Sequence, residues 1–121
     1  MEMCEEMKRL RDMLTSHKIE YTDASTICPK ELISKCMAHG LSENMSDTTV
    51  YRTHFKIGTD TYSVIYGYAT YGGYDPVTDV DKKYLELRIN GDTPVWFLTA
   101  NDIISYIKIK HNLVSYYEGD Y

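Results

Sequence analysis

Three basic side chains recur at every second position of one stretch of the chain, at Arg52, His54 and Lys56. The stretch, residues 49–57, is rich in β-branched and aromatic residues and predicts a β-strand. Residues two apart in a strand point to the same face, so we expect a basic ridge on one face of a sheet. Arginine suits bidentate contact with a phosphate or carboxylate better than lysine does. The ridge is therefore either an anion-contacting strip or an ordinary solvated face.

A second stretch with chemical potential is residues 66–75, which hold four tyrosines and three glycines. Tyrosine offers a flat apolar ring with a hydroxyl at its edge, and glycine lets the backbone turn sharply or approach a ligand. The combination suits a surface that stacks on rings, with Tyr71 as its candidate ligand contact. The alternative is a strand that ends in a turn, with tyrosines partly buried in a β-rich core.

Motifs for catalysis and for metal binding are missing from the sequence. The histidines show no metal-ligand spacing, no Cys-x-x-Cys pair exists, and no nucleophile elbow or Walker-type phosphate loop is found. The glycines of residues 67–73 do not fit a dinucleotide-binding fingerprint. We therefore expect a binding protein and no enzyme, with no cofactor and no metal.

Length and charge narrow the class further. The 121 residues fit one domain spanning residues 1–121, and no apolar run is long enough to cross a membrane. The acidic start lacks the apolar core of a signal peptide, and the odd cysteine count favours reduced thiols in a cytoplasm. A net charge of -5 argues against DNA or RNA as a partner, although a few local cations can still bind a small anion.

The N-terminal part of the chain predicts a helix and a short strand. From residue 2 to about residue 17, apolar residues at spacings of four, three and four form one helical stripe, at Met3, Met7, Leu10 and Leu14. Residues 19–23 alternate as a short strand. Residues 29–39 could form a second helix with Pro29 in its first turn, and residues 41–47 a loop.

The remainder predicts a sheet closed by a second helix. Residues 49–57 and 61–69 form a hairpin around the turn at 58–60, and residues 75–83 form a surface loop. Strands follow at 84–89 and 94–98, joined by an Asn-Gly turn. Thr99 and Asp102 suit a capping box for a final helix. The tail, residues 113–121, is unusually aromatic and could dock on its own domain or on a neighbouring subunit. We expect an α+β fold with an N-terminal helix, an antiparallel sheet of about four or five strands and a C-terminal helix.

Several of these segments together resemble a known family. Arg52-Thr53-His54-Phe55, the run from Tyr62 to Gly73 and the run from Trp96 to Ile103 are similar to the first-described family of phage anti-Thoeris proteins. The resemblance covers most of the chain and implies a non-enzymatic sponge. Such a protein binds cyclic ADP-ribose isomers, the signals made by Thoeris TIR proteins in the host bacterial cytoplasm, and releases them intact. It also implies a homo-hexamer, with separate sites for the cyclic di- or trinucleotides of CBASS.

The resemblance also implies particular ligand contacts. Tyr21, where the family tends to have tryptophan, would stack on adenine, and Arg52 would take a phosphate. Tyr84 and Asn90 match an aromatic and an asparagine of the family approximately. The family has a basic residue near the end of the last helix, and here Lys108, Lys110 or His111 would serve in place of arginine.

Two other classes of function stay open. One is an enzyme that degrades a cyclic nucleotide with His54 as acid or base. The other is a protein-binding inhibitor of a defence effector, whose acidic surface mimics nucleic acid.

Overall fold

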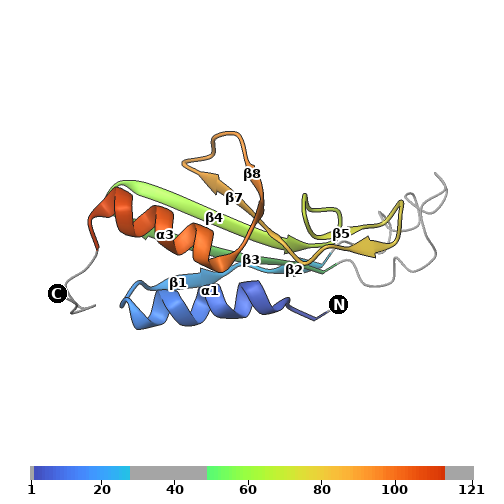
Figure 1. Ribbon diagram of the computed structural model, residues 1–121, viewed down its shortest axis with the longest axis horizontal. Coiled ribbons are helices and arrows are strands. Elements are labelled where there is room, and N and C mark those ends of the chain that lie inside the picture. The colour runs from blue at the N-terminus through green and yellow to red at the C-terminus, as the bar shows by residue number, and fades with distance from the viewer. Residues whose placement is uncertain (1, 28–48, 114–121) are drawn as a thin grey trace.

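Two helices pack side by side on one face of an antiparallel sheet in the computed structural model of the chain (Figure 1). The structure describes residues 2–27 and 49–113. Helix α1 spans Glu5–Ser16 and helix α3 spans Ala100–His111. The N-terminal helix, the sheet and the C-terminal helix confirm the predicted α+β fold.

The main sheet runs in the order β1-β3-β4-β7-β8, and β2 also pairs with β3. All its neighbouring strands are antiparallel. A small second sheet consists of β5 and β6 alone and lies at the end of the molecule away from the C-terminal end of α3 (Figure 1). The strands are β1 (Tyr21–Asp23), β2 (Thr26–Ile27), β3 (Thr49–Ile57), β4 (Asp60–Gly67), β5 (Tyr74–Asp75), β6 (Val80–Asp81), β7 (Leu85–Ile89) and β8 (Val95–Leu98).

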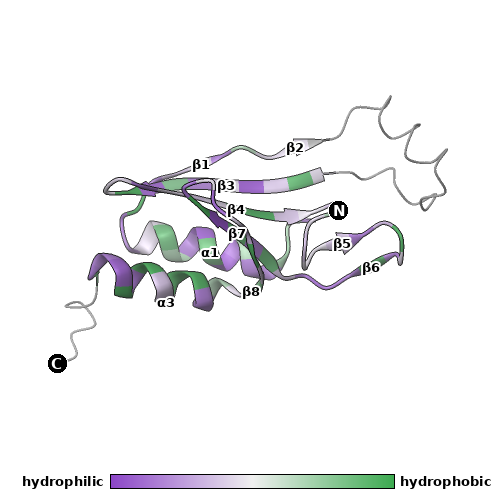
Figure 2. Cartoon of the chain, turned by 90° about the horizontal axis from the view of Figure 1, so that it is seen from above, coloured by the Kyte–Doolittle hydropathy of each residue, from purple (hydrophilic) through white to green (hydrophobic). Residues whose placement is uncertain are grey.

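Helix α1 follows the predicted stripe. Met7, Leu10 and Leu14 are fully buried, and acidic side chains occupy the first turn, where the helix dipole favours them. The helix begins at Glu5, later than the predicted residue 2, because the chain at Cys4 is extended. Hydrophobic and hydrophilic residues occur along both helices, as expected for helices with one buried side (Figure 2).

Helix α3 begins at the predicted capping box. The backbone N–H of Asp102 donates to Thr99 Oγ1 at 3.2 Å, and the Thr99 N–H donates to Asp102 Oδ2 at 2.9 Å. These bonds satisfy donors that a helix start leaves free. Ile103, Ile104 and Ile107 then face the core.

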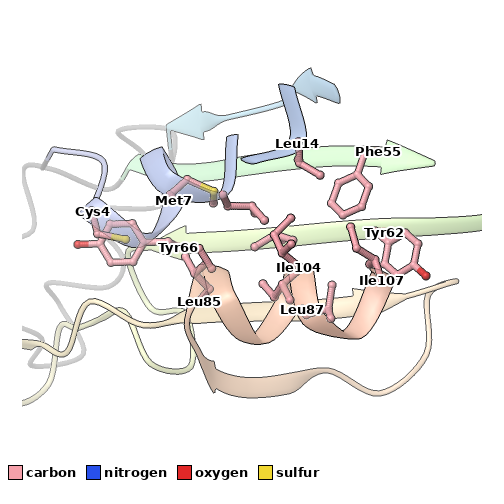
Figure 3. Close-up of a cluster of buried hydrophobic side chains, with 14 residues drawn as sticks. Cys4, Met7, Leu14, Phe55, Tyr62, Tyr66, Leu85, Leu87, Ile104 and Ile107 are labelled. Carbon is pink, nitrogen blue, oxygen red and sulfur yellow. The ribbon is translucent and has the colours of Figure 1, made fainter. Parts of the chain in front are cut away.

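The core lies between the helices and the sheet (Figure 3). Tyr62 and Tyr66, both on β4, mark its two ends, with Tyr66 beside Cys4. The Phe55 and Tyr62 rings stack with centroids 4.9 Å apart. Each fully buried aliphatic side chain contributes about 1.5–3 kcal/mol, so this single layer of contacts holds the helices to the sheet.

Alternation along β3 and β4 separates two faces of the sheet. Thr53 and Phe55 are buried on the helix side, and so are Tyr62, Val64 and Tyr66. The residues between them, including Arg52 and His54, therefore lie on the opposite, outer face. The predicted basic ridge has the expected placement.

One predicted loop was wrong. Residues 75–83 contain strand β6 and the end of strand β5, with Tyr74 paired to Asp81 and Asp75 to Val80. Two tyrosine hydroxyls anchor this hairpin, because Tyr66 donates to Asp81 Oδ2 and Tyr74 donates to Asp79 Oδ1. Both donor tyrosines lie outside residues 75–83. The polar composition of that segment alone therefore predicted a loop.

The predicted helix at 29–39 and the loop at 41–47 lie outside the described residues, as does the aromatic tail beyond residue 113. Among the residues that are described, no helix has the length and apolar character needed to cross a bilayer.

Candidate functional site

The strand register aligns four polar side chains in one row across the outer face. Thr22 of β1 is opposite His54 of β3, His54 is opposite Ser63 of β4, and Ser63 is opposite Arg88 of β7. Residues directly opposite one another in antiparallel strands point to the same face. Side chains from four strands therefore meet in a single line, which we call the cross-strand row.

Two further rows flank it on the same face. Arg52 is opposite Ile65, which is opposite Glu86, and Lys56 is opposite Thr61. The outer face thus gathers basic side chains within a chain whose net charge is -5. The helices α1 and α3 both pack on the other face and leave this one uncovered by helix within the described ranges (Figures 1 and 2). A local positive potential on an acidic protein follows from this segregation.

Arg52 has an unusual environment. Its backbone N–H donates to Ser25 Oγ at 3.1 Å, and its carbonyl accepts from the Ala24 N–H at 3.0 Å and from Arg11 Nη2 at 3.2 Å. The backbone is therefore well fixed. The side-chain Nε is buried and has no hydrogen-bond partner among the described residues. A buried unpaired donor costs about 1–3 kcal/mol, and a bound anion would remove that cost.

A depression of about 950 Å³ lies over the cross-strand row. Its lining includes His54, Ser63 and Arg88, with Lys56 from the next row and Glu20 from the segment before β1. Arg52 is two residues from His54 along β3, on the same face, and does not line the depression itself.

Tyr21 lies on the other face of the sheet from Arg52. It is opposite Phe55, and it packs against the core on the helix side. The guanidinium of Arg11 sits over its ring, 5.4 Å from the centroid. That arginine is held by Thr53 Oγ1 at 2.8 Å and by Asp23 at 3.3 Å. One face of the Tyr21 ring is thus taken by Arg11, and a base could stack only on the other.

The same cluster shifts the acidity of Asp23. Hydrogen bonds from Ser25, then from Arg11, lower the pKa of the Asp23 carboxyl to about 2. Arg11 and Asp23 therefore stay paired at any physiological pH, and their role is to tie α1 to the start of the sheet.

Tyr71 and Tyr84 belong to a surface aromatic group at the Glu86 end of the Arg52 row, since the Tyr71 N–H donates to Glu86 Oε1 at 3.0 Å. The Tyr71 ring stacks on Trp96 with centroids 4.4 Å apart, and Tyr84 meets Phe97 edge-on at 6.1 Å. All four rings are exposed. A cavity of about 420 Å³ beside them is lined by Tyr71 and Phe97, with Lys82 over the Phe97 ring. These rings can stack on a flat ligand or on another protein surface.

Asn90 and Lys110 are engaged inside the chain. Asn90 Oδ1 accepts from the Thr61 N–H at 2.8 Å, and its Nδ2 donates to Asp60 Oδ1 at 2.9 Å. Lys110 Nζ lies 3.1 Å from Asp60 Oδ2. Hydrogen bonds from Asn90, then from Lys110, lower the pKa of Asp60. These contacts join two turns to the end of α3, and the half-buried Lys108 lies on the same helix.

His111 completes this network without forming a catalytic relay. Its Nε2 lies 2.6 Å from the Tyr62 hydroxyl and 3.5 Å from Asp60 Oδ2. A relay needs its two partners on different ring nitrogens, whereas both contacts here use the same one. The described residues also contain no group of three or more His, Cys, Asp or Glu placed to hold a metal ion.

Comparisons with protein-family models, curated proteins and solved structures found no match.

The structure thus brings the candidate residues together in separate groups. Arg52 and His54 share the outer face, and Tyr71 and Tyr84 belong to the aromatic group. Tyr21 lies on the helix side of the sheet. The remaining candidates, Asn90, Lys108 and Lys110, lie toward the C-terminal end of α3 or in a turn that packs against it.

Arg88 is a basic residue of the outer face that the sequence interpretation missed. The alternation of Leu85 and Leu87 with Glu86 and Arg88 was a usable signal, since it places Arg88 on the face opposite the core. Its alignment with His54 depends on the register of two strand pairs, which the alternation does not give.

Proposed function

We propose that the protein is a phage anti-defence sponge that sequesters cyclic ADP-ribose isomers made by Thoeris TIR proteins, without cleaving them. It acts in the host bacterial cytoplasm. The observation that carries the proposal is the buried Nε of Arg52, which has no partner among the described residues and lies on a basic sheet face. The resemblance of the Arg52-Thr53-His54-Phe55 segment to the anti-Thoeris family supplies the identity of the ligand.

The chemistry of the ligand suits this face. Cyclic ADP-ribose carries a purine, two riboses and a pyrophosphate, so it needs cationic groups and ring surfaces. One charge-assisted contact between arginine and phosphate contributes about 1.5–3 kcal/mol, and stacking on an aromatic ring about 1–3 kcal/mol per base.

A homo-oligomer, a hexamer in our proposal, would gather the groups that one chain holds apart. The aromatic group with Tyr71 and Tyr84 is separate from Arg52, and Tyr21 lies on the opposite face of the sheet. Pockets between subunits would place rings from one chain near cations of another. Separate sites for CBASS cyclic di- or trinucleotides are part of the same proposal.

The test is calorimetric binding of cyclic ADP-ribose isomers, followed by heat release and chromatography of the ligand. We expect tight binding and recovery of intact signal. Arg52→Met should weaken binding roughly 10- to 100-fold, the loss of one charge-assisted contact. Lys8→Ala, which removes a positive charge from the exposed side of α1, is the matched control and should leave affinity unchanged.

Two results would replace the proposal. Recovery of a cleaved ligand would identify an enzyme. Absence of binding, together with capture of a defence effector that Arg52→Met does not disturb, would identify a protein-binding inhibitor.

A further inference from the structure

The cross-strand row contains a set of hydrogen-bonding side chains that have no partner within residues 2–27 and 49–113. The side chains of His54, Ser63 and Arg88 form no hydrogen bond or ion pair with the described residues. All three line the same depression. An acidic residue directly across from an arginine in a sheet would stabilise it, yet Arg88 is opposite Ser63.

The charges around the row leave it net basic. Lys56 lines the depression and is two residues from His54 on the same strand face. Glu20 is the acidic residue of the lining, and it is exposed. Glu86, on the outer face beside Ile65, is buried and uses Oε1 to accept the Tyr71 N–H at 3.0 Å. Its carboxylate is thus directed to the backbone of the tyrosine segment.

The spacing of the row indicates the kind of anion. His54 and Arg88 are separated by two strand intervals, which is roughly 9.6 Å between backbones. The Ser63 hydroxyl lies between them on the same face. A single phosphate would have to be shared by His54, Ser63 and Arg88. Two linked phosphates can bridge that interval, with the arginine fork on one and the imidazole on the other.

We propose that His54, Ser63 and Arg88 form a diphosphate-binding subsite, with Arg88 as its main anion contact. The inference rests on the proposed function in that it assigns the pyrophosphate of the signal to this row. It also makes a separate claim, because the subsite should discriminate diphosphate from monophosphate whatever the rest of the ligand is.

The experiment is titration calorimetry of the full chain with inorganic pyrophosphate and with inorganic phosphate, at matched ionic strength. We expect pyrophosphate to bind at least roughly 10-fold more tightly than phosphate. Arg88→Ala should remove that preference, and Arg88→Lys should restore part of it, because lysine keeps the charge but not the bidentate fork. Lys8→Ala is the control for a lost positive charge and should keep the preference.

Equal affinity for the two anions, or an equal effect of Arg88→Ala and Lys8→Ala, would overturn the inference. Circular dichroism and the melting temperature check that each variant is folded. Pyrophosphate binding through Arg88 without binding of cyclic ADP-ribose isomers would leave the subsite standing and reject the proposed function. Signal binding that is equal in wild type and Arg88→Ala, with no pyrophosphate binding, would reject the subsite and leave the proposed function standing.

Discussion

Two arginines in contact across α1 and β3 have opposite environments. Arg11 donates to Thr53 and Asp23 and lies over the Tyr21 ring, and its side chain is only 12% exposed. The Arg52 carbonyl accepts a third hydrogen bond from Arg11, but the Arg52 Nε has no partner in the described part of the chain. Arg11 therefore stabilises the fold, whereas in our proposal the Arg52 Nε–H donates to a ligand.

This contrast predicts opposite effects on the stability of the ligand-free protein. Arg52→Met removes a buried unpaired donor and keeps an apolar stem, so the free energy of unfolding should stay equal or rise by about 1 kcal/mol. Arg11→Met leaves the Thr53 hydroxyl and the Arg52 carbonyl short of a donor and should lower it by about 2 kcal/mol or more. Urea denaturation measures both. A loss in Arg52→Met as large as that in Arg11→Met would show that Arg52 is structural.

At the scale of elements, the tyrosine- and glycine-rich segment serves the packing of backbone against backbone. Gly67 ends β4 with φ +144°, and a Cβ there would lie 2.3 Å from the Thr49 carbonyl oxygen. At Gly73 the space is filled by Thr70, whose Oγ1 would be 2.2 Å from an added Cβ. These glycines allow close approach within the chain, and the tyrosines around them anchor the β5–β6 hairpin.

Gly67→Ala should therefore be far more damaging than another glycine substitution at positive φ. Gly58→Ala is the matched control, since φ is +62° there and no atom lies within 4 Å of the added Cβ. We expect Gly58→Ala to lower the free energy of unfolding by about 1 kcal/mol, from backbone strain alone. Gly67→Ala adds a clash with fixed backbone and should cost about 3 kcal/mol or more. Equal losses in chemical denaturation would contradict this account of Gly67.

At the scale of the whole molecule, polar groups on the two sides of the sheet have different environments. Two tyrosine hydroxyls lie at the ends of the core, where burial raises the pKa of both Tyr62 and Tyr66, and for Tyr66 the bond to Asp81 raises it further. The basic side chains lie on the face that α1 and α3 do not cover. Within the described residues, the same sheet thus separates a desolvated side from a side that carries basic side chains.

The raised pKa values predict a stability limit in alkali. The folded protein keeps these phenols neutral above their ordinary pKa of about 10, while the unfolded chain ionises them. Their contribution to stability is fully present below pH 10 and is lost as pH rises above it. Between pH 9.5 and 11, Tyr66→Phe should reduce the slope of the free energy of unfolding against pH by roughly the amount for one titrating proton. At pH 7 it should lower the free energy of unfolding by about 1 kcal/mol, because the hydrogen bond to Asp81 is lost.

Urea unfolding across this pH range tests the prediction. Tyr71→Phe serves as the control, since it removes a phenol from an exposed ring instead of a buried one. An alkaline slope that is the same in Tyr66→Phe and in wild type would show that Tyr66 does not set the limit.

The sequence by itself determined the features that depend on local periodicity and on the residues that cap helices. The apolar stripe of α1, the capping box at Thr99, the β3–β4 hairpin and the shared face of Arg52 and His54 were all predicted correctly. Each follows from residues close together in the chain, because the periods of helix and strand fix which side chains face the same way.

Only the tertiary structure decided what depends on contacts between distant segments. The register of β4 and β7 adds Arg88 to the row of His54. The pairing of β1 with β3 places Tyr21 on the helix side of the sheet. Asp60 draws Asn90 and Lys110 into an internal network. The physical reason is that alternation fixes the face of a strand residue but not its neighbour. The neighbour is set by register, which depends on how the whole core packs.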